Sequence, residues 1–202
     1  MALGLTKSSG DDSFLPILKL NSVSGDVTIS SSVKNAAGDW EKQEKDVKLP
    51  AKLIFDFENL EVGWMHFGSQ GPTFALVKLG QPMPTKPADH DPDKKKYNQG
   101  FRIRVYSKEY GLAVLSQSSK TVGEVMDILH DQYLTGAKAN PGKVAVVEFK
   151  GTKKVSVKTK EGAKNYKQPD WSIVSWVARP EAMNAKVETP EPAAEVSDDT
   201  DF

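Results

Sequence analysis

Basic and aromatic side chains share faces of the predicted strands in the second half of the chain. Strand alternation places Arg102, Arg104 and Tyr106 on one face of the segment FRIRVYS, and Lys154 and Lys158 on one face of KVSVKTK. Phosphates require cations and unstacked bases require flat rings, so these residue types together are typical of a surface for single-stranded nucleic acid. The candidate binding residues are Lys94, Lys95, Lys96, Tyr97, Arg102, Arg104, Tyr106, Lys153, Lys154, Lys158, Lys160, Tyr166, Lys167 and Trp171.

Tryptophan residues have to be divided between this surface and the core. Trp171 and Trp176 are five residues apart in the segment WSIVSWVAR, and an odd spacing places them on opposite faces of a strand. We therefore expect at most one of the two in the core and the other in a position to stack on a base. The spacing leaves open which of them takes each role.

A metal or catalytic site has little support in the sequence. The segment DHDPD groups His90 with three aspartates, which suit hard cations, but no second cluster completes a site and a solvated loop is the favoured interpretation. Motifs for a serine nucleophile, a zinc protease or a phosphate-binding loop are absent. The lack of cysteine excludes disulfides, thiol chemistry and zinc sites built on cysteine. We expect no cofactor, no metal and no enzymatic activity.

The formal net charge of zero conceals a separation of charge along the chain. Residues 94–180 carry 17 basic and 7 acidic side chains, whereas residues 1–93 carry 9 basic and 13 acidic ones. Residues 181–202 add one lysine and seven acids. A basic face attracts polyanions, and an acidic segment of the same chain can compete for that face.

The length of 202 residues is typical of one domain with extensions. No apolar run approaches the roughly 20 residues that a membrane-spanning helix needs. The segment MALGLTKSSGDD lacks the basic flank and apolar stretch of a secretory signal. We therefore expect a cytoplasmic protein that does not enter a membrane.

The elements that carry the candidate residues are mostly short strands. In the first half we expect strands at 14–20, 26–33 and 51–60, a hairpin of 61–68 and 72–80, and loops at 35–46 and 81–100. In the second half we expect strands at 101–107, 109–117, 143–149, 154–160 and 171–179, with a turn at 150–153 and a loop at 161–170. One helix is predicted, beginning at Ser118 or at Thr121 in a capping box with Glu124 and ending near Gly136.

This order of elements favours a mainly β fold built as a small closed or partly open barrel. A helix between the third and fourth barrel strands is the topology of the OB-fold. We expect a flexible N-terminus at 1–13 and an OB-fold-like domain at 14–180. Residues 181–202 are poor in bulky apolar side chains and rich in Pro and Glu, which predicts a disordered acidic tail.

The segment SDDTDF, residues 197–202, carries a more specific signal. Phe202 follows Asp198, Asp199 and Asp201, and it has no neighbouring apolar side chain against which to pack. In this ending the chain resembles single-stranded-DNA-binding proteins of bacteria and phages. Its length and its single helix among strands are more similar to those of the phage members.

The resemblance implies that the barrel holds single-stranded DNA without reading its sequence, during phage replication and recombination. It implies that the tail recruits replication and recombination proteins, with Asp198, Asp199, Asp201 and Phe202 as the partner-binding residues. The same tail can occupy the protein's own basic surface until DNA displaces it. In that case the protein would act in the host cytoplasm.

Three other functions are compatible with the same residues. The chain could be an RNA-binding or duplex-binding OB module, because phosphate contacts alone distinguish neither the sugar nor the strand number. It could be a mediator that anneals complementary strands. It could also be a phage structural protein for which the basic half is incidental. The sequence leaves its oligomeric state open.

Overall fold

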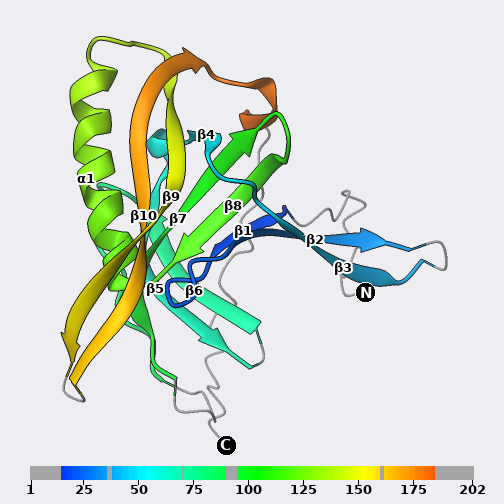
Figure 1. The fold of residues 1–202 in the computed structure, drawn as a ribbon, viewed down its shortest axis with the longest axis vertical. Coiled ribbons are helices and arrows are strands. Elements are labelled where there is room, and N and C mark those ends of the chain that lie inside the picture. Colours follow the sequence, from blue (N-terminus) through cyan, green and yellow to red (C-terminus); the bar gives the residue numbers. More distant parts are fainter. Residues whose placement is uncertain (1–14, 36–37, 70, 90–94, 160–161, 185–202) are drawn as a thin grey trace, which may run out of the picture.

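A computed structural model describes residues 15–35, 38–69, 71–89, 95–159 and 162–184 of the chain. The N-terminus at 1–13 and nearly all of the predicted acidic tail therefore lie outside the described residues, as do Lys94 and Lys160. Within the described part, the mainly β prediction is confirmed: strands predominate and one α-helix lies among them (Figure 1).

Ten strands, one α-helix and two short 3-10 helices make up the described part of the chain. From the N-terminus onward they are β1 (Ile17–Leu20), β2 (Val27–Lys34), β3 (Trp40–Asp46), β4 (Ala51–Phe55), η1 (Phe57–Asn59), β5 (Glu61–Gly68), β6 (Gly71–Lys78), β7 (Asn98–Ser107), β8 (Gly111–Gln117), α1 (Lys120–Ala137), β9 (Lys143–Thr159), β10 (Gly162–Ala178) and η2 (Glu181–Met183).

All ten strands belong to one mixed sheet with the order β10-β9-β4-β7-β8-β1-β2-β3, and the β5–β6 hairpin branches from β7. Neighbours are antiparallel except β1 and β8, which are parallel. The described strands do not close into a barrel through a strand ladder, so a closed barrel is not observed and the OB-fold prediction is not confirmed. The two sides approach at one point, where the backbone N–H of Lys167 on β10 donates to the carbonyl of Ser22, 2.6 Å away.

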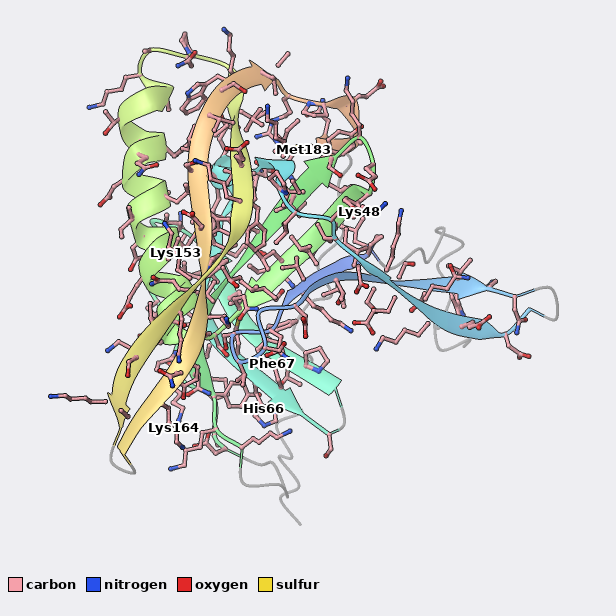
Figure 2. All side chains as sticks on the ribbon, in the orientation of Figure 1. Lys48, His66, Phe67, Lys153, Lys164 and Met183 are labelled. Atoms are coloured by element: carbon pink, nitrogen blue, oxygen red, sulfur yellow. The ribbon has the colours of Figure 1, made fainter. Side chains whose placement is uncertain are left out.

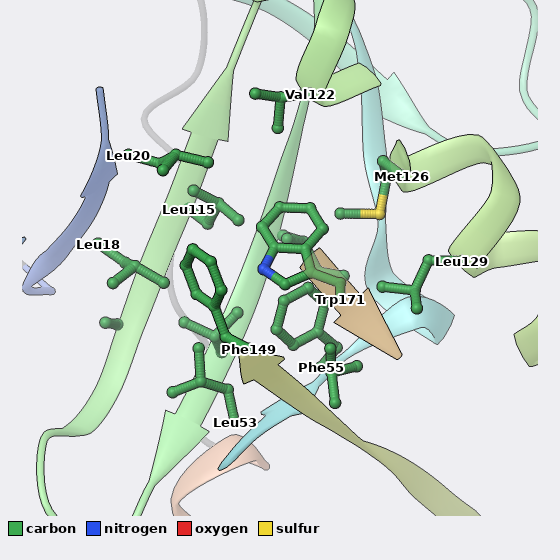
Figure 3. Close-up of a cluster of buried hydrophobic side chains, with 14 of the residues drawn as sticks. Leu18, Leu20, Leu53, Phe55, Leu115, Val122, Met126, Leu129, Phe149 and Trp171 are labelled. Carbon is green, nitrogen blue, oxygen red and sulfur yellow. The ribbon is translucent and has the colours of Figure 1, made fainter. Parts of the chain in front are cut away.

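The core lies between the curved sheet and helix α1 (Figure 3). Val122, Met126 and Leu129 recur at helical spacing and are almost fully buried, so one face of the helix covers the sheet. Trp171 packs edge-on against Phe55 and Phe149, with ring centroids 5.6 and 5.7 Å apart. Burial of large aromatic side chains supplies much of the hydrophobic stabilisation of such a core.

The largest error in the predicted elements concerns β9 and β10. The expected turn at 150–153 and loop at 161–170 are wrong, because both segments belong to two continuous 17-residue strands. Beyond Gly151 and Asp170 the two strands leave the core and pair only with each other. The segments 150–153 and 162–168 consist mostly of polar residues and glycine, so no alternation of apolar and polar residues marks them as strands.

The segment around β3 was predicted as a loop and is also a strand. All seven of its residues are exposed, and β3 pairs only with β2 in the described part of the chain. A strand with no buried face has no need of apolar side chains, which explains why its sequence, WEKQEKD, indicated a loop. The predicted hairpin of β5 and β6 is confirmed.

Helix α1 begins at Lys120, so its N-cap is Ser119 and the capping box predicted at Thr121 is wrong. Thr121 is inside the first turn, where it is buried and its hydroxyl lies 3.0 Å from that of Ser119. The helix ends at Ala137, one residue beyond Gly136. Among the described residues no helix is long and apolar enough to cross a membrane.

Candidate nucleic-acid interface

The extension of β9 and β10 carries most of the predicted lysines (Figure 2), and we call residues 150–167 of this pair the basic ribbon. The register pairs Lys154 with Lys167, and Lys158 with Ala163. Cross-strand partners in an antiparallel pair point to the same face, so Lys154, Lys158 and Lys167 lie on one face of the ribbon. A register shift between Asp170 and Trp171 separates this ribbon from the part of the pair that enters the core.

The other face of the ribbon combines basic and aromatic side chains. Tyr166 is paired with Val155, and Lys164 is paired with Val157. Tyr166 is half-buried, while Lys164 is exposed. Lys153 lies on this face too, but it forms an ion pair with Asp170 at 2.8 Å. A ring flanked by lysines and apolar valines is a suitable platform for an unstacked base.

The ribbon carries an excess of basic side chains, although Lys150 and Lys153 are paired with Glu148 and Asp170. Residues 150–167 contain seven lysines and one acid. Lys154 and Lys158 are exposed, and neither has an ion-pair partner among the described residues. Lysines held close together without counter-charges raise the local positive potential, and a phosphate chain can lower it.

The arginines predicted on β7 are placed differently. Arg102 forms a two-pronged ion pair with Glu61, at 2.5 and 3.1 Å, and its guanidinium lies over the ring of Phe74. Arg104 donates to Asp56 at 2.7 Å. Both share an outward face of β7, as predicted, but their charges are already matched by carboxylates. They therefore contribute less than the ribbon lysines to attraction of phosphate.

Asp56 is the centre of a buried ionic cluster. Its side chain is fully buried and accepts hydrogen bonds from Arg104, Arg179 and Asn59. Burial raises the pKa of the Asp56 carboxyl, but the hydrogen bonds from Arg179 and Asn59 and the charges of both arginines outweigh it, so the pKa lies below its usual value. The hydrogen bond to Asp56 raises the pKa of Arg179. The cluster joins η1, β7 and the end of β10, which is a structural role.

The long segment between β6 and β7 packs on the β5–β6 hairpin over its described residues. Tyr97, predicted as a stacking residue, lies against the ring of His66 at 5.1 Å, and its hydroxyl lies 2.9 Å from that of Thr73. The backbone N–H of Tyr97 donates to Asp89, and the indole N–H of Trp64 donates to the carbonyl of Pro84. Lys95 and Lys96 are exposed beside this anchored tyrosine.

One of the predicted aromatic residues, Trp171, lies in the core and not on an open surface. It is only 7% exposed, so stacking of its ring on a base would require the sheet to open. Trp176 is the half-buried one of the pair and stacks on Tyr133 at 5.6 Å. Tyr106 is half-buried on the outward face of β7. Tyr166 is thus the ribbon's aromatic candidate.

Sequence reasoning missed Lys164, which is exposed on the ribbon opposite Val157. The sequence pattern predicts a loop for its segment, and a loop residue has no expected position across from β9. The signal was present: lysines recur at 158, 160, 164 and 167 with only one intervening acid. The predicted partner-binding residues Asp198, Asp199, Asp201 and Phe202 lie outside the described residues.

The described residues offer no cluster of three or more histidine, aspartate or glutamate side chains that could hold a metal ion. His90 and its neighbours Asp91 and Asp93 lie outside the described residues, while Asp89 is engaged with Lys86 and the backbone of Tyr97. Comparison of the chain with protein-family models, with curated proteins and with solved structures finds no match.

Proposed function

We propose that the chain binds single-stranded DNA without sequence preference and protects it during phage DNA replication and recombination. The observation that carries the proposal is the basic ribbon, where Lys154 and Lys158 have no ion-pair partner in the described structure and Tyr166 lies beside Lys164 on the opposite face. Cations that follow a backbone and rings that accept bases are the two parts of a single-strand site.

The strand arrangement supports an OB-type origin for this surface. Strands β10-β9-β4-β7-β8 form a continuous antiparallel path, and helix α1 lies between the third and fourth of these strands in chain order. In an OB-fold interpretation the ribbon extends the connection between the last two barrel strands, one of the connections with which OB-folds bind oligonucleotides. Strand β1 then occupies the seam beside β8.

The proposal assigns the acidic C-terminal segment a recruiting role. Residues 185–202 contain six acids, one lysine and Phe202. Such a segment is attracted to the basic ribbon in the absence of DNA, and DNA would release it for replication or recombination proteins. The aspartates and Phe202 would then engage a partner surface that is basic at its rim and apolar at its centre.

Duplex DNA is the alternative ligand that a specific observation favours. A two-stranded β-ribbon fits the major groove of B-DNA, and the basic ribbon is such an element. An RNA ligand, strand annealing and a purely structural phage role stay as further alternatives. The duplex and RNA alternatives are separated from the main proposal by the ligand that wins in competition, and the structural role by the absence of binding.

Fluorescence anisotropy of a labelled oligo-dT, titrated with the protein at two salt concentrations, tests the proposal. We expect saturable binding that weakens as salt increases, with unlabelled oligo-dT a better competitor than the matching duplex or oligo-U RNA. A preference for duplex DNA or for RNA would show that this alternative is the ligand of the site. No binding of any of the three at physiological salt would refute the nucleic-acid function.

A further inference from the structure

Strands β2 and β3 form an arm that projects from the body of the molecule, away from the basic ribbon (Figure 1). Strand β3 is the last strand of the sheet, and its outer edge has no partner strand in the described residues. An edge of this kind exposes a row of N–H and C=O groups to which another strand can pair.

The hydrogen bonds at the two ends of the arm show which residues face outward. The backbone N–H of Val47 donates to the carbonyl of Val27, and the backbone N–H of Asn35 donates to the carbonyl of Asp39. The odd-numbered residues of β3 between these two bonds therefore direct their backbone groups toward β2. The outward groups therefore belong to the even-numbered residues Trp40, Lys42, Glu44 and Asp46.

The charges along β3 are complementary to those of the same segment aligned in the opposite direction. The segment EKQEK, residues 41–45, reads acid, base, neutral, acid, base in the forward direction. Read backwards, every charged position meets the opposite sign. Edge strands commonly carry charges that prevent unwanted strand pairing. The charges of β3 oppose pairing with other strands and favour a strand whose charges follow the complementary order.

We propose that β3 pairs antiparallel with β3 of a second copy of the chain, around a two-fold axis at Gln43. In this register Lys42 lies opposite Glu44 of the second copy and Glu41 opposite Lys45 of the second copy, and each contact occurs twice. Such an interface is isologous and closes after two copies. The outward backbone groups of Lys42 and Glu44 then face each other, as a hydrogen-bonded antiparallel pair requires.

Neighbouring registers are excluded by charge. An axis at Lys42 would place two lysines directly opposite each other, and an axis at Glu44 would do the same with two glutamates. An axis at Gln43 opposes two neutral amides instead.

The side chains are available for this pairing. Those of Lys42, Glu44 and Lys45 are 61%, 45% and 66% exposed. Their present ion pairs are long ones at the surface: Lys42 with Glu44 at 3.6 Å, Lys45 with Glu109 at 3.9 Å, and Glu44 with Lys19 at 3.5 Å. Glu44 also accepts a 2.8 Å hydrogen bond from Thr28, and the ammonium group of Lys45 lies 5.1 Å from the ring centre of Tyr110. Solvent-exposed pairs of this kind are weak, so the residues can be shared with a second copy.

The aromatic residue at the start of β3 fits the same interface. Trp40 is 51% exposed, with the ammonium group of Lys34 5.1 Å from its ring centre. In the proposed register Trp40 lies opposite Asp46 of the second copy, where it covers the end of the ladder. Neither position belongs to the basic ribbon, so this inference does not depend on DNA binding.

A charge-exchange experiment tests the proposal with the full-length chain. One variant carries Lys42→Glu and Lys45→Glu, and the other carries Glu41→Lys and Glu44→Lys. Each should self-associate at least about tenfold more weakly than the native chain, because every cross-strand pair becomes repulsive. An equimolar mixture of the two should recover a 1:1 dimer, because every pair becomes attractive again. Sedimentation velocity over a range of concentrations measures both effects.

The control variant carries Lys138→Glu and Lys143→Glu, which make the same change in net charge as Lys42→Glu with Lys45→Glu, at exposed positions away from the arm. It should dimerise like the native chain. A native chain that stays monomeric at all concentrations would overturn the proposal. Unchanged self-association of the two charge variants, or a mixture that gives no heterodimer while both remain folded by circular dichroism, would overturn it too.

Discussion

At the scale of single residues, what distinguishes the basic side chains is whether a carboxylate already matches their charge. Arg102 and Arg104 are paired with Glu61 and Asp56, whereas Lys154 and Lys158 have no such partner in the described structure. All four were equivalent candidates in the sequence. The structure separates them into charges that stabilise the fold and charges that are open to a ligand.

Removal of the two ribbon lysines should weaken DNA binding. The double variant Lys154→Ala and Lys158→Ala loses two phosphate contacts, so the slope of log affinity against log salt should become shallower by roughly 1.4 for single strands. Anisotropy titrations with labelled oligo-dT at several salt concentrations measure this slope. The double variant Lys108→Ala and Lys138→Ala, which removes equal charge elsewhere, should keep the native slope; equal losses in both would argue against the ribbon as the site.

The buried ionic cluster should make the protein sensitive to acid. Because the folded state lowers the pKa of Asp56, the ionised carboxylate stabilises the protein above its unfolded pKa of about 3.9. That stabilisation is lost as the pH falls through the lower folded pKa. The change Asp56→Asn removes the buried anion that Arg104 and Arg179 share, although Arg179 keeps its ion pair with Glu58 at 2.6 Å. It should reduce the free energy of unfolding by about 3 kcal/mol or more at pH 7.

Urea unfolding between pH 7 and pH 2.5 checks this effect. The Asp56→Asn variant should also lose less stability on acidification than the native chain, since it lacks the group that titrates. The change Asp127→Asn on the exposed face of helix α1 is the matched control and should alter neither quantity. A native-like stability of Asp56→Asn at pH 7 would contradict the structural role of the cluster.

At the scale of elements, the way that helix α1 meets β10 depends on a single small residue. Gly136 lies against Trp176, and a Cβ at this position would be 2.5 Å from Cζ2 of the indole ring. Trp176 is itself stacked on Tyr133, which stacks on Phe57. The ring therefore has little room to move, and the helix and strand can approach closely only because residue 136 has no side chain.

Two glycine substitutions in the same helix should have opposite effects. Gly136→Ala should lower the free energy of unfolding by about 1–3 kcal/mol, because it overpacks the contact with Trp176. Gly123→Ala, where the added Cβ meets nothing within 4 Å, should raise it by up to about 1 kcal/mol through helix propensity. Thermal or urea unfolding of both variants measures the difference; equal effects would show that the close approach is not a constraint.

At the scale of the whole molecule, the folded body extends beyond Pro180, where the sequence placed its end. Met183 in η2 is only 1% exposed, so Glu181–Met183 belongs to the body. A deletion of the acidic segment that spares the described body therefore begins at residue 185. This boundary matters for any test of whether the acidic segment competes with DNA. A longer deletion removes the buried Met183 together with the acids, so it changes stability as well as competition.

Deletion of residues 185–202 should increase affinity for oligo-dT at low salt and leave the stability of the body unchanged. The reason is that six acids no longer compete for the basic ribbon. The increase should disappear at high salt, where such attraction is screened. Anisotropy titration and thermal unfolding of the same sample give both quantities.

Deletion of residues 181–202 is the comparison for this experiment. It removes the buried Met183 as well and should reduce the free energy of unfolding by about 2–5 kcal/mol. If the shorter deletion leaves DNA affinity unchanged at low salt, the acidic segment does not compete for the site.

The sequence by itself determined the features that depend on local pattern. The period-two alternation of Phe101, Ile103 and Val105 indicated a strand with one buried face, and the helical spacing of Val122, Met126 and Leu129 indicated the helix. The lysine-rich composition of 150–167 was equally plain. Each of these signals arises from residues close together in the chain, so a comparison of neighbouring positions is enough to detect it.

Only the tertiary structure decided which basic side chains are paired with a carboxylate and which strands leave the core. The partners of Arg102 and Arg104 are 41 and 48 positions away in the chain, so no local pattern could reveal them. Strand β3 is exposed on both faces and lacks the alternation that burial imposes, and the segments 150–153 and 162–168 of β9 and β10 lack it too. Their strand structure comes from hydrogen bonds to a neighbouring strand, and those bonds are formed only when the chain folds.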